Sequence, residues 1–160
     1  MSSNAATIES FYQAFEQRDH AAMAACYHRD VHFSDPVFTD LRGDEVTAMW
    51  HMLCVQGTDL TVQYGDVTSE GEGGTAHWEA GYTFTPTGRF VHNAVDASFV
   101  FQDGRIIEHV DDFDLWRWTR QALGTLGVLT GWTGLARGKV REAADQNLRR
   151  FIDEHPEYDR

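Results

Sequence analysis

The chain has 160 residues, a length typical of one domain that buries a core of its own. Hydrophobic residues make up 42% of it and aromatic residues 12%, which excludes a disordered chain. Acidic residues outnumber basic ones by 25 to 13, and the formal net charge of −12 argues against nucleic acid and membrane surfaces as partners.

Three helices are predicted before any long strand. The first shows the i, i+3, i+4, i+7 spacing of an amphipathic helix in four residues: Ile8, Phe11, Tyr12 and Phe15. The second follows Asp19, an N-cap residue, and extends through Tyr27. A short strand around Val31 and Phe33 then ends at Asp35 and Pro36. The third helix opens at residues 43–45 and has one apolar face: Val46, Met49, Trp50 and Leu53.

From residue 60 onward apolar and polar residues alternate, which predicts strands. Residues 69–74 are predicted to form a loop and residues 86–88 a turn. Asp103-Gly104 predicts a type I′ hairpin between strands 89–101 and 105–113. Helices segregated from an antiparallel sheet indicate the α+β class. We expect a strongly curved antiparallel sheet, a cone-shaped half-barrel capped by the three helices, with an apolar pocket inside.

The C-terminal region is predicted to be helical. Asp114 is an N-cap for a helix that carries Leu115, Trp118 and Ala122. Residues 124–134 are rich in glycine and apolar residues, and residues 139–152 again have helical spacing. We divide the chain into an α+β domain, residues 1–118, and a C-terminal helical extension, residues 119–160, packed on the same domain. The basic residues of the extension are interpreted as a solvated helix face.

Two carboxylates stand out as candidates for chemistry. Asp35 ends the first strand beside a proline, and Asp96 lies in the middle of a long strand. Two carboxyls in one dry pocket can divide into a base and a neutral hydrogen-bond donor, because burial and mutual repulsion raise the pKa of one of them. The alternatives are an ordinary turn residue for Asp35 and an outward-facing strand carboxylate for Asp96.

The last strand adds a second candidate group. His109, Asp111 and Phe113 share one face of that strand. His109 and Asp111 are either an imidazole oriented by a carboxylate, or a hydrogen-bonded histidine beside a solvated acid. A metal site would need a third ligand from His77 or His92, and the spacing matches no known metal signature, so we expect no metal.

Two further features concern the cellular compartment. Cys26 and Cys54 are too few for a disulfide framework and form no CxxC motif, so we expect free thiols. The N-terminus has no basic or apolar leader segment, and no stretch of about 18 apolar residues follows. These features predict a cytoplasmic protein.

With these elements in place, the chain resembles the NTF2-like (cystatin-like) superfamily, and within it the ketosteroid isomerase and SnoaL-like polyketide cyclase branch. The resemblance covers roughly residues 5 to 118. It rests on the order of helices and strands and on three segments: residues 27–36, the hairpin from 96 to 106, and residues 108–111 with Asp114. This fold hosts isomerases, cyclases, dehydratases, epoxide hydrolases and non-catalytic binders.

The resemblance implies roles for particular residues. Asp35 matches the family's general base, and Asp96 matches the carboxylic acid of its oxyanion hole. The sequence departs from the family at Phe11, where the relatives place an oxyanion-hole tyrosine, because the adjacent Tyr12 is rotated by about 100° around the helix. The tail from about Thr119 is a second departure. We expect it either to cover the pocket or to cross to a second subunit.

These observations predict a small-molecule enzyme that transfers protons with carboxylates, as an isomerase, cyclase or dehydratase-like lyase, without a cofactor. The alternatives are a non-catalytic carrier of an apolar metabolite and a protein-interaction domain. The predicted partners are a small apolar or carbonyl-containing molecule and a second copy of the chain, in a homodimer formed through the convex sheet face. The predicted catalytic residues are Asp35, Asp96, His109 and Asp111. The predicted substrate contacts are Phe11, Tyr12, Phe15, Trp50, Trp78, Tyr82, His92 and Phe113.

Overall fold

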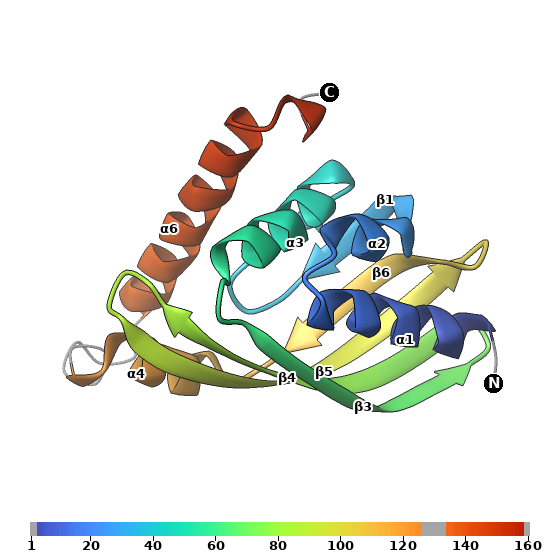
Figure 1. Ribbon diagram of the computed structural model, residues 1–160, viewed down its shortest axis with the longest axis horizontal. Helices are drawn as coiled ribbons and strands as arrows, with labels where there is room; N and C mark the ends of the chain where they lie inside the picture. The colour runs from blue at the N-terminus through green and yellow to red at the C-terminus, as the bar shows by residue number, and fades with distance from the viewer. Residues whose placement is uncertain (1–2, 126–133, 159–160) are drawn as a thin grey trace.

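The computed structural model describes residues 3–125 and 134–158. Six strands form one curved sheet in the order β2-β1-β6-β5-β4-β3 (Figure 1). Strands β3 to β6 are the predicted antiparallel meander, whereas β1 pairs in parallel with β6. The strands are β1 (Tyr27–Ser34), β2 (Leu41–Arg42), β3 (Thr61–Glu70), β4 (Gly73–Phe84), β5 (Arg89–Gln102) and β6 (Arg105–Asp112).

The first three helices lie together across one face of this sheet (Figure 1). They are α1 (Ser3–Glu16), α2 (His20–Ala25) and α3 (Asp44–Gln56). The Asp19 carboxylate accepts a hydrogen bond from the Ala22 amide, as the predicted N-cap of α2 should. The predicted α+β class, with a curved sheet capped by three helices, is therefore confirmed. No helix of the described residues is long and apolar enough to cross a membrane.

The core lies between the helices and the concave face of the sheet. Along β5, buried Val95, Ala97 and Phe99 alternate with exposed neighbours, so one side of the strand faces the helices. On the helix side, Ile8, Phe11, Tyr12 and Phe15 of α1 are buried, as their spacing predicted. Cys26 and Cys54 are free thiols.

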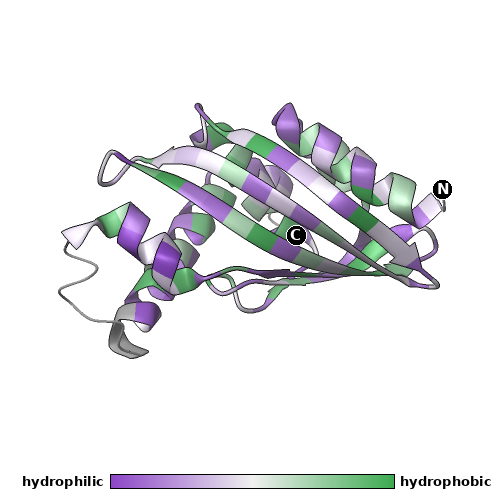
Figure 2. Cartoon of the chain, turned by 90° about the horizontal axis from the view of Figure 1, so that it is seen from below, coloured by the Kyte–Doolittle hydropathy of each residue, from purple (hydrophilic) through white to green (hydrophobic). Residues whose placement is uncertain are grey.

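The outer face of the sheet is seen from below in Figure 2, where no helix of the described residues lies in front of its central strands. Its exposed side chains are mostly polar, and two large apolar side chains are exposed on β5, Phe90 and Val100. The Asp103-Gly104 turn between β5 and β6 has positive φ at both residues, 56° and 76°, as the predicted type I′ turn requires.

The C-terminal helices pack at two different places, one on strand β5 and the other on helix α3. Helix α4 (Leu115–Leu123) packs along β5, where the Gln121 side chain bonds both the amide and the carbonyl of His92. It thereby satisfies backbone groups of β5 beyond the end of β6. Helix α6 (Gly134–Asp153) packs against α3 through buried Leu148 and Phe151 and leads to η1 (Pro156–Tyr158).

Several predicted boundaries differ from the structure. Tyr27 begins β1 and does not end the second helix, and most of the predicted loop 69–74 belongs to β3 and β4. The predicted division between residues 118 and 119 falls inside α4. Residues 126–133 of the glycine-rich segment lie outside the described residues.

Candidate functional site

The pairing of β1 with β6 brings together candidate site residues that are far apart in the sequence. Phe33 lies opposite His109 and Ser34 opposite Val110, in parallel register. Because the two strands run in parallel, the next residues, Asp35 and Asp111, lie at the same end of the pair. Burial raises the pKa of Asp35, and the charge of the Asp111 carboxylate raises it further. The structure thus brings together Asp35, His109 and Asp111.

A buried chain of hydrogen bonds extends from Asp111 through His109. His109 Nε2 lies 2.8 Å from Asp111 Oδ1, and His109 Nδ1 lies 2.7 Å from the Tyr27 hydroxyl. The Trp50 indole donates to that hydroxyl at 2.8 Å, and the Trp78 indole donates to Asp111 Oδ1 at 3.3 Å. Each group in the chain is satisfied if a neutral imidazole carries its proton on Nε2 and Tyr27 donates to Nδ1.

Asp35 sits in a tight turn that binds its own carboxylate. Oδ1 accepts the amides of Val37 at 2.7 Å and Phe38 at 2.6 Å, and the Asp35 amide donates to the Phe38 carbonyl at 2.8 Å. Burial, reinforced by the charge of Asp111, outweighs these donors and raises the pKa of Asp35 from 3.8 to about 7. Asp35 as a whole residue is half-buried. Asp35 is therefore half-ionised near neutral pH.

Half-buried aromatic residues accompany Asp35. The Trp118 indole donates to the Tyr82 hydroxyl at 2.7 Å, which leaves the hydroxyl proton of Tyr82 free to be donated elsewhere. Burial raises the pKa of Tyr82, and the nearby Asp35 carboxylate raises it further. Phe113, directly after β6, is also half-buried and packs on the edge of the core. Of these side chains, Tyr82 is the one whose pKa the charge of Asp35 affects, so it is the aromatic neighbour of the candidate site.

Five predicted substrate contacts are core residues in the structure: Phe11, Tyr12, Phe15, Trp50 and Trp78. Their rings pack edge-to-face, with Phe15 to Trp50 centroids 5.1 Å apart and Phe15 to Trp78 centroids 5.4 Å apart. Tyr12 is buried on the same helix face as Phe11, as the spacing of α1 predicted. Among the described residues, its hydroxyl is the one buried side-chain polar atom without a hydrogen-bond partner. Ligand contact by these five residues stays a prediction.

The prediction that Asp96 belongs to this site is wrong. Asp96 lies on the outer face of β5, with 83% of its side chain exposed, and its carboxylate pairs with His77 of β4 at 2.8 Å. His92 lies on the same outer face and pairs with Glu79 at 3.1 Å. The physical reason is the strict alternation of a strand, since Val95 and Ala97 take the inner face. A proton-transfer pair of Asp35 and Asp96 is thereby excluded.

The same geometry bears on the metal alternative. His77 and His92, the candidate third ligands, lie on the face opposite His109 and Asp111. In the described part of the chain, no three His, Cys, Asp or Glu side chains are arranged to hold a metal ion.

The surface of the described residues includes two depressions away from the candidate site. One, of about 440 Å³, is a shallow hollow on the outer sheet face that includes His77 and Asp96. The other, of about 260 Å³, lies between the segment 37–41 and α6. Neither is lined by Asp35, His109 or Asp111, so the pocket expected inside the cone is not among them.

Sequence reasoning missed two members of the site. Tyr27 is predicted at the end of a helix, although Tyr27 to Ser34 is consistent with a strand once Cys26 ends the preceding turn. Trp118 is predicted on the apolar face of its helix, and no sequence signal connects it with Tyr82. The helix spacing of Trp118 indicates its face but not its partner.

Comparison with known proteins agrees with this architecture. Residues 8–109, more than half of the chain, match the SnoaL-like domain family, and the chain belongs to that family, which has the NTF2-like fold. No curated protein matches the sequence.

Solved structures with the same fold carry several different names. An NTF2-like protein of unknown function from Burkholderia pseudomallei is 23% identical, with a TM-score of 0.68 over 76% of this chain and 98% of that one. An LEH-like epoxide hydrolase from M. tuberculosis is 19% identical (TM-score 0.62; 80% and 96% covered). IdmH of Streptomyces antibioticus, named as a candidate polyketide cyclase, is 21% identical (TM-score 0.62; 78% and 98% covered). At these identities the likeness establishes the fold.

Proposed function

We propose that the protein is a cofactor-independent enzyme that transfers a proton on a small, apolar, carbonyl-containing molecule, with Asp35 as the base. One observation carries the proposal. Asp35 has a pKa raised to about 7 by burial and by the charge of Asp111, so that it is poised to exchange a proton near neutral pH. A general acid or base works best when its pKa lies near the working pH.

The hydrogen bonds around Asp35 indicate which oxygen acts. Oδ1 already accepts two backbone amides, so Oδ2 is the oxygen that takes the proton from a carbon next to the carbonyl. The bonding electrons pass to the carbonyl oxygen and form an enolate. Asp35 then returns the proton to the same or another carbon, which completes an exchange or an isomerisation.

The developing oxyanion needs a donor near Asp35. With Asp96 excluded, the Tyr82 hydroxyl is the best candidate, because it accepts from Trp118 and keeps its own proton to donate. The hydrogen-bonded chain Asp111–His109–Tyr27 is more deeply buried than Asp35. Its part in the proposal is to hold the Asp111 carboxylate in place, where its charge adds to the rise in the pKa of Asp35 that burial causes.

The fold supports this proposal without deciding it. Structures of the same fold are named as a candidate polyketide cyclase and an epoxide hydrolase, and both names describe chemistry on small molecules. The alternative is a carrier that binds such a molecule without reaction. Its support is the group of half-buried aromatic side chains Tyr82, Phe113 and Trp118, which offers mainly apolar contact.

The test measures hydrogen–deuterium exchange at the carbon next to the carbonyl of 1-tetralone and 2-tetralone in D₂O, by proton NMR. The wild-type protein should accelerate exchange, with an acid limb whose midpoint lies near 7. Asp35→Asn should lower the enzymatic rate by about 100-fold or more. Asp96→Asn is the matched control, a carboxylate on the outer face, and should stay within about twofold of wild type.

Unchanged exchange in Asp35→Asn would show that Asp35 is not the base. If the tetralones quench tryptophan fluorescence on binding and neither is exchanged faster than in buffer, the carrier alternative is favoured instead.

A further inference from the structure

The segment that carries Asp35 is weakly attached to the sheet. Residues 35–40 connect β1 to β2, and β2 has only two residues, Leu41 and Arg42, paired with Phe33 and His32. The turn at Asp35 bonds mainly to itself, through the Asp35 carboxylate and the Val37 and Phe38 amides. A turn of this kind needs outside contacts if its carboxylate is to keep a fixed place.

Helix α6 provides one such contact directly. Arg141 Nε donates to the carbonyl of Pro36 at 2.9 Å, across 105 residues of sequence. Pro36 lies between Asp35 and the first of its two amide donors, so this bond holds the backbone of the turn itself. Leu148 and Phe151, buried against α3, fix the helix from which Arg141 projects.

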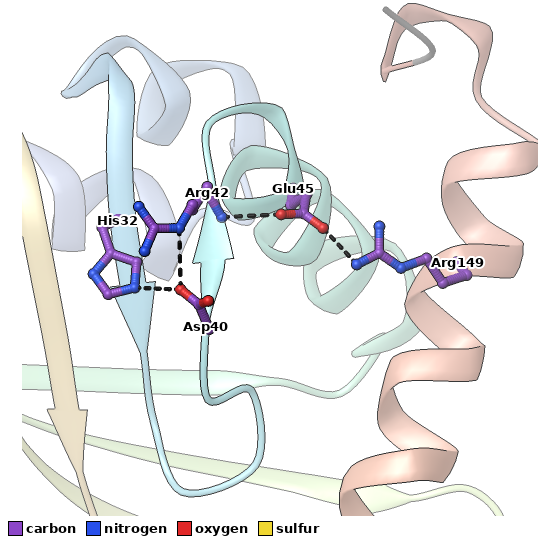
Figure 3. A network of polar contacts seen from close by, with 5 residues as sticks. All are labelled: His32, Asp40, Arg42, Glu45 and Arg149. Atoms are coloured by element: carbon purple, nitrogen blue, oxygen red, sulfur yellow. Dashed lines mark hydrogen bonds and ion pairs between the residues drawn. The ribbon is translucent and has the colours of Figure 1, made fainter.

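A second contact ties α6 to the other end of the segment (Figure 3). Arg149 pairs with Glu45, and Glu45 also accepts the amide of Arg42 at 3.1 Å. The Arg42 side chain reaches Asp40 at 3.3 Å, and Asp40 lies 2.6 Å from His32 Nε2. The segment 35–42 is therefore held between two arginines of one helix, with the 260 Å³ groove between them.

We propose that Arg141 is a positioning residue for Asp35, and that α6 serves the site by holding the Asp35 turn closed beside Asp111. This inference rests on the proposed role of Asp35. Exposed contacts of this kind contribute little to overall stability. The proposed role of the Arg141 contact is therefore to place the turn.

Loosening of the turn should change the titration of Asp35 whatever the substrate is. Burial is the largest cause of the raised pKa of Asp35, ahead of the opposing amide donors. When the turn loosens, water reaches the carboxylate, and the pKa of Asp35 should fall toward that of an ordinary aspartate. The amides of Val37 and Phe38 should exchange with solvent faster for the same reason.

The experiment is a ¹³C-carboxyl NMR titration of Asp35, with amide exchange at Val37 and Phe38, in the full-length protein. Arg141→Ala should lower the titration midpoint of Asp35 by about one pH unit and accelerate exchange of the two amides by about tenfold. Arg141→Lys keeps a donor on a long stem and should restore most of both. Arg150→Ala, an exposed arginine on the same helix, is the matched control and should change neither.

Three results separate the possibilities. If Arg141→Ala is folded and titrates as wild type, the positioning role is refuted. If Arg141→Ala fails to fold, Arg141→Lys is the deciding variant. A folded Lys variant that shows the full fall in the Asp35 midpoint and the full acceleration of amide exchange would refute the donor role. If Asp35→Asn keeps tetralone exchange while Arg141→Ala still shifts the titration, the proposed function fails and the positioning of the turn stands. If the proposed function and the positioning role both hold, the acid limb of tetralone exchange in Arg141→Ala should shift together with the titration midpoint of Asp35.

Discussion

Asp35 lies in an environment that disfavours its charged form. The same environment that suits it to proton transfer lowers the free energy of unfolding when the carboxyl is ionised. Its pKa is about 7 in the folded chain against the ordinary aspartate value of 3.8, so the folded state binds more protons between these values. Stability from this group is fully present below about pH 3.8 and is lost as the pH rises through 7.

Asp35→Asn should therefore stabilise the protein more at high pH than at low pH. The gain in the free energy of unfolding near pH 8 should exceed the gain near pH 5 by roughly 2 kcal/mol, measured by urea denaturation. Asp96→Asn, exposed on the outer face, should change by less than about 1 kcal/mol. A gain that does not depend on pH would contradict the raised pKa of Asp35.

Two buried tyrosines should respond in opposite ways to loss of the hydroxyl. The Tyr12 hydroxyl has no partner within the described chain, whereas the Tyr27 hydroxyl bonds both His109 and Trp50. Tyr12→Phe removes an unsatisfied buried group and should raise the free energy of unfolding by about 1 kcal/mol. Tyr27→Phe leaves two partners unsatisfied and should lower it by about 2–3 kcal/mol. Equal effects in thermal denaturation would contradict this assignment of partners.

At the scale of elements, three histidines join the C-terminus to α2 and α3. The His20 and His51 rings stack with centroids 3.5 Å apart, and His155 lies 5.1 Å from His51. The His51 Nδ1 atom is 2.8 Å from the Tyr158 hydroxyl. Burial lowers the pKa of His51, and His20 and His155 lower it further, against an opposing effect of Glu157. The cluster therefore favours the neutral form of His51.

Acidification should loosen the C-terminal segment. Because the pKa of His51 is lowered in the folded state, the unfolded segment binds more protons below about pH 6.5, and the docked state loses stability as the pH falls. Hydrogen exchange of residues 148–158, normalised to intrinsic rates, should be faster near pH 5 than near pH 7.5. His51→Gln should reduce this pH dependence, and His32→Gln, paired with Asp40 outside the cluster, should not. Equal protection at both pH values would rule the effect out.

At the scale of the whole molecule, we propose that two copies pair through the outer sheet face. Phe90 and Val100, 63% and 41% exposed, offer apolar contact there. The chain carries a net charge of −12, so two copies repel one another at long range. Sedimentation at micromolar concentration should show a dimer whose dissociation constant falls when salt is raised from low to physiological levels, because screening weakens the repulsion. A monomer under both conditions would refute the dimer.

The amino-acid sequence predicts only part of the candidate site. Asp35, His109 and Asp111 are predicted as members of one site, and the structure places Asp35 directly after β1, beside the strand β6 that carries the other two. Their shared role in chemistry stays a prediction. The prediction for Asp96 is wrong, although the alternation of Val95, Ala97 and Phe99 already indicates that it faces outward. The family resemblance places Asp96 inside the site, whereas the alternation of the strand places it outside, as the structure does.

Most of the helices and strands, the caps at Asp19 and Asp114, the hairpin at Asp103-Gly104 and the class of the fold follow from the amino-acid sequence, since these depend on local periodicity and turn chemistry. Only the tertiary structure decided which groups meet. Asp35 and Asp111 are 76 positions apart and become neighbours through a parallel strand pair, and Arg141 reaches Pro36 from a helix 105 residues away. Such contacts depend on register and helix docking, which the packing of the whole core selects.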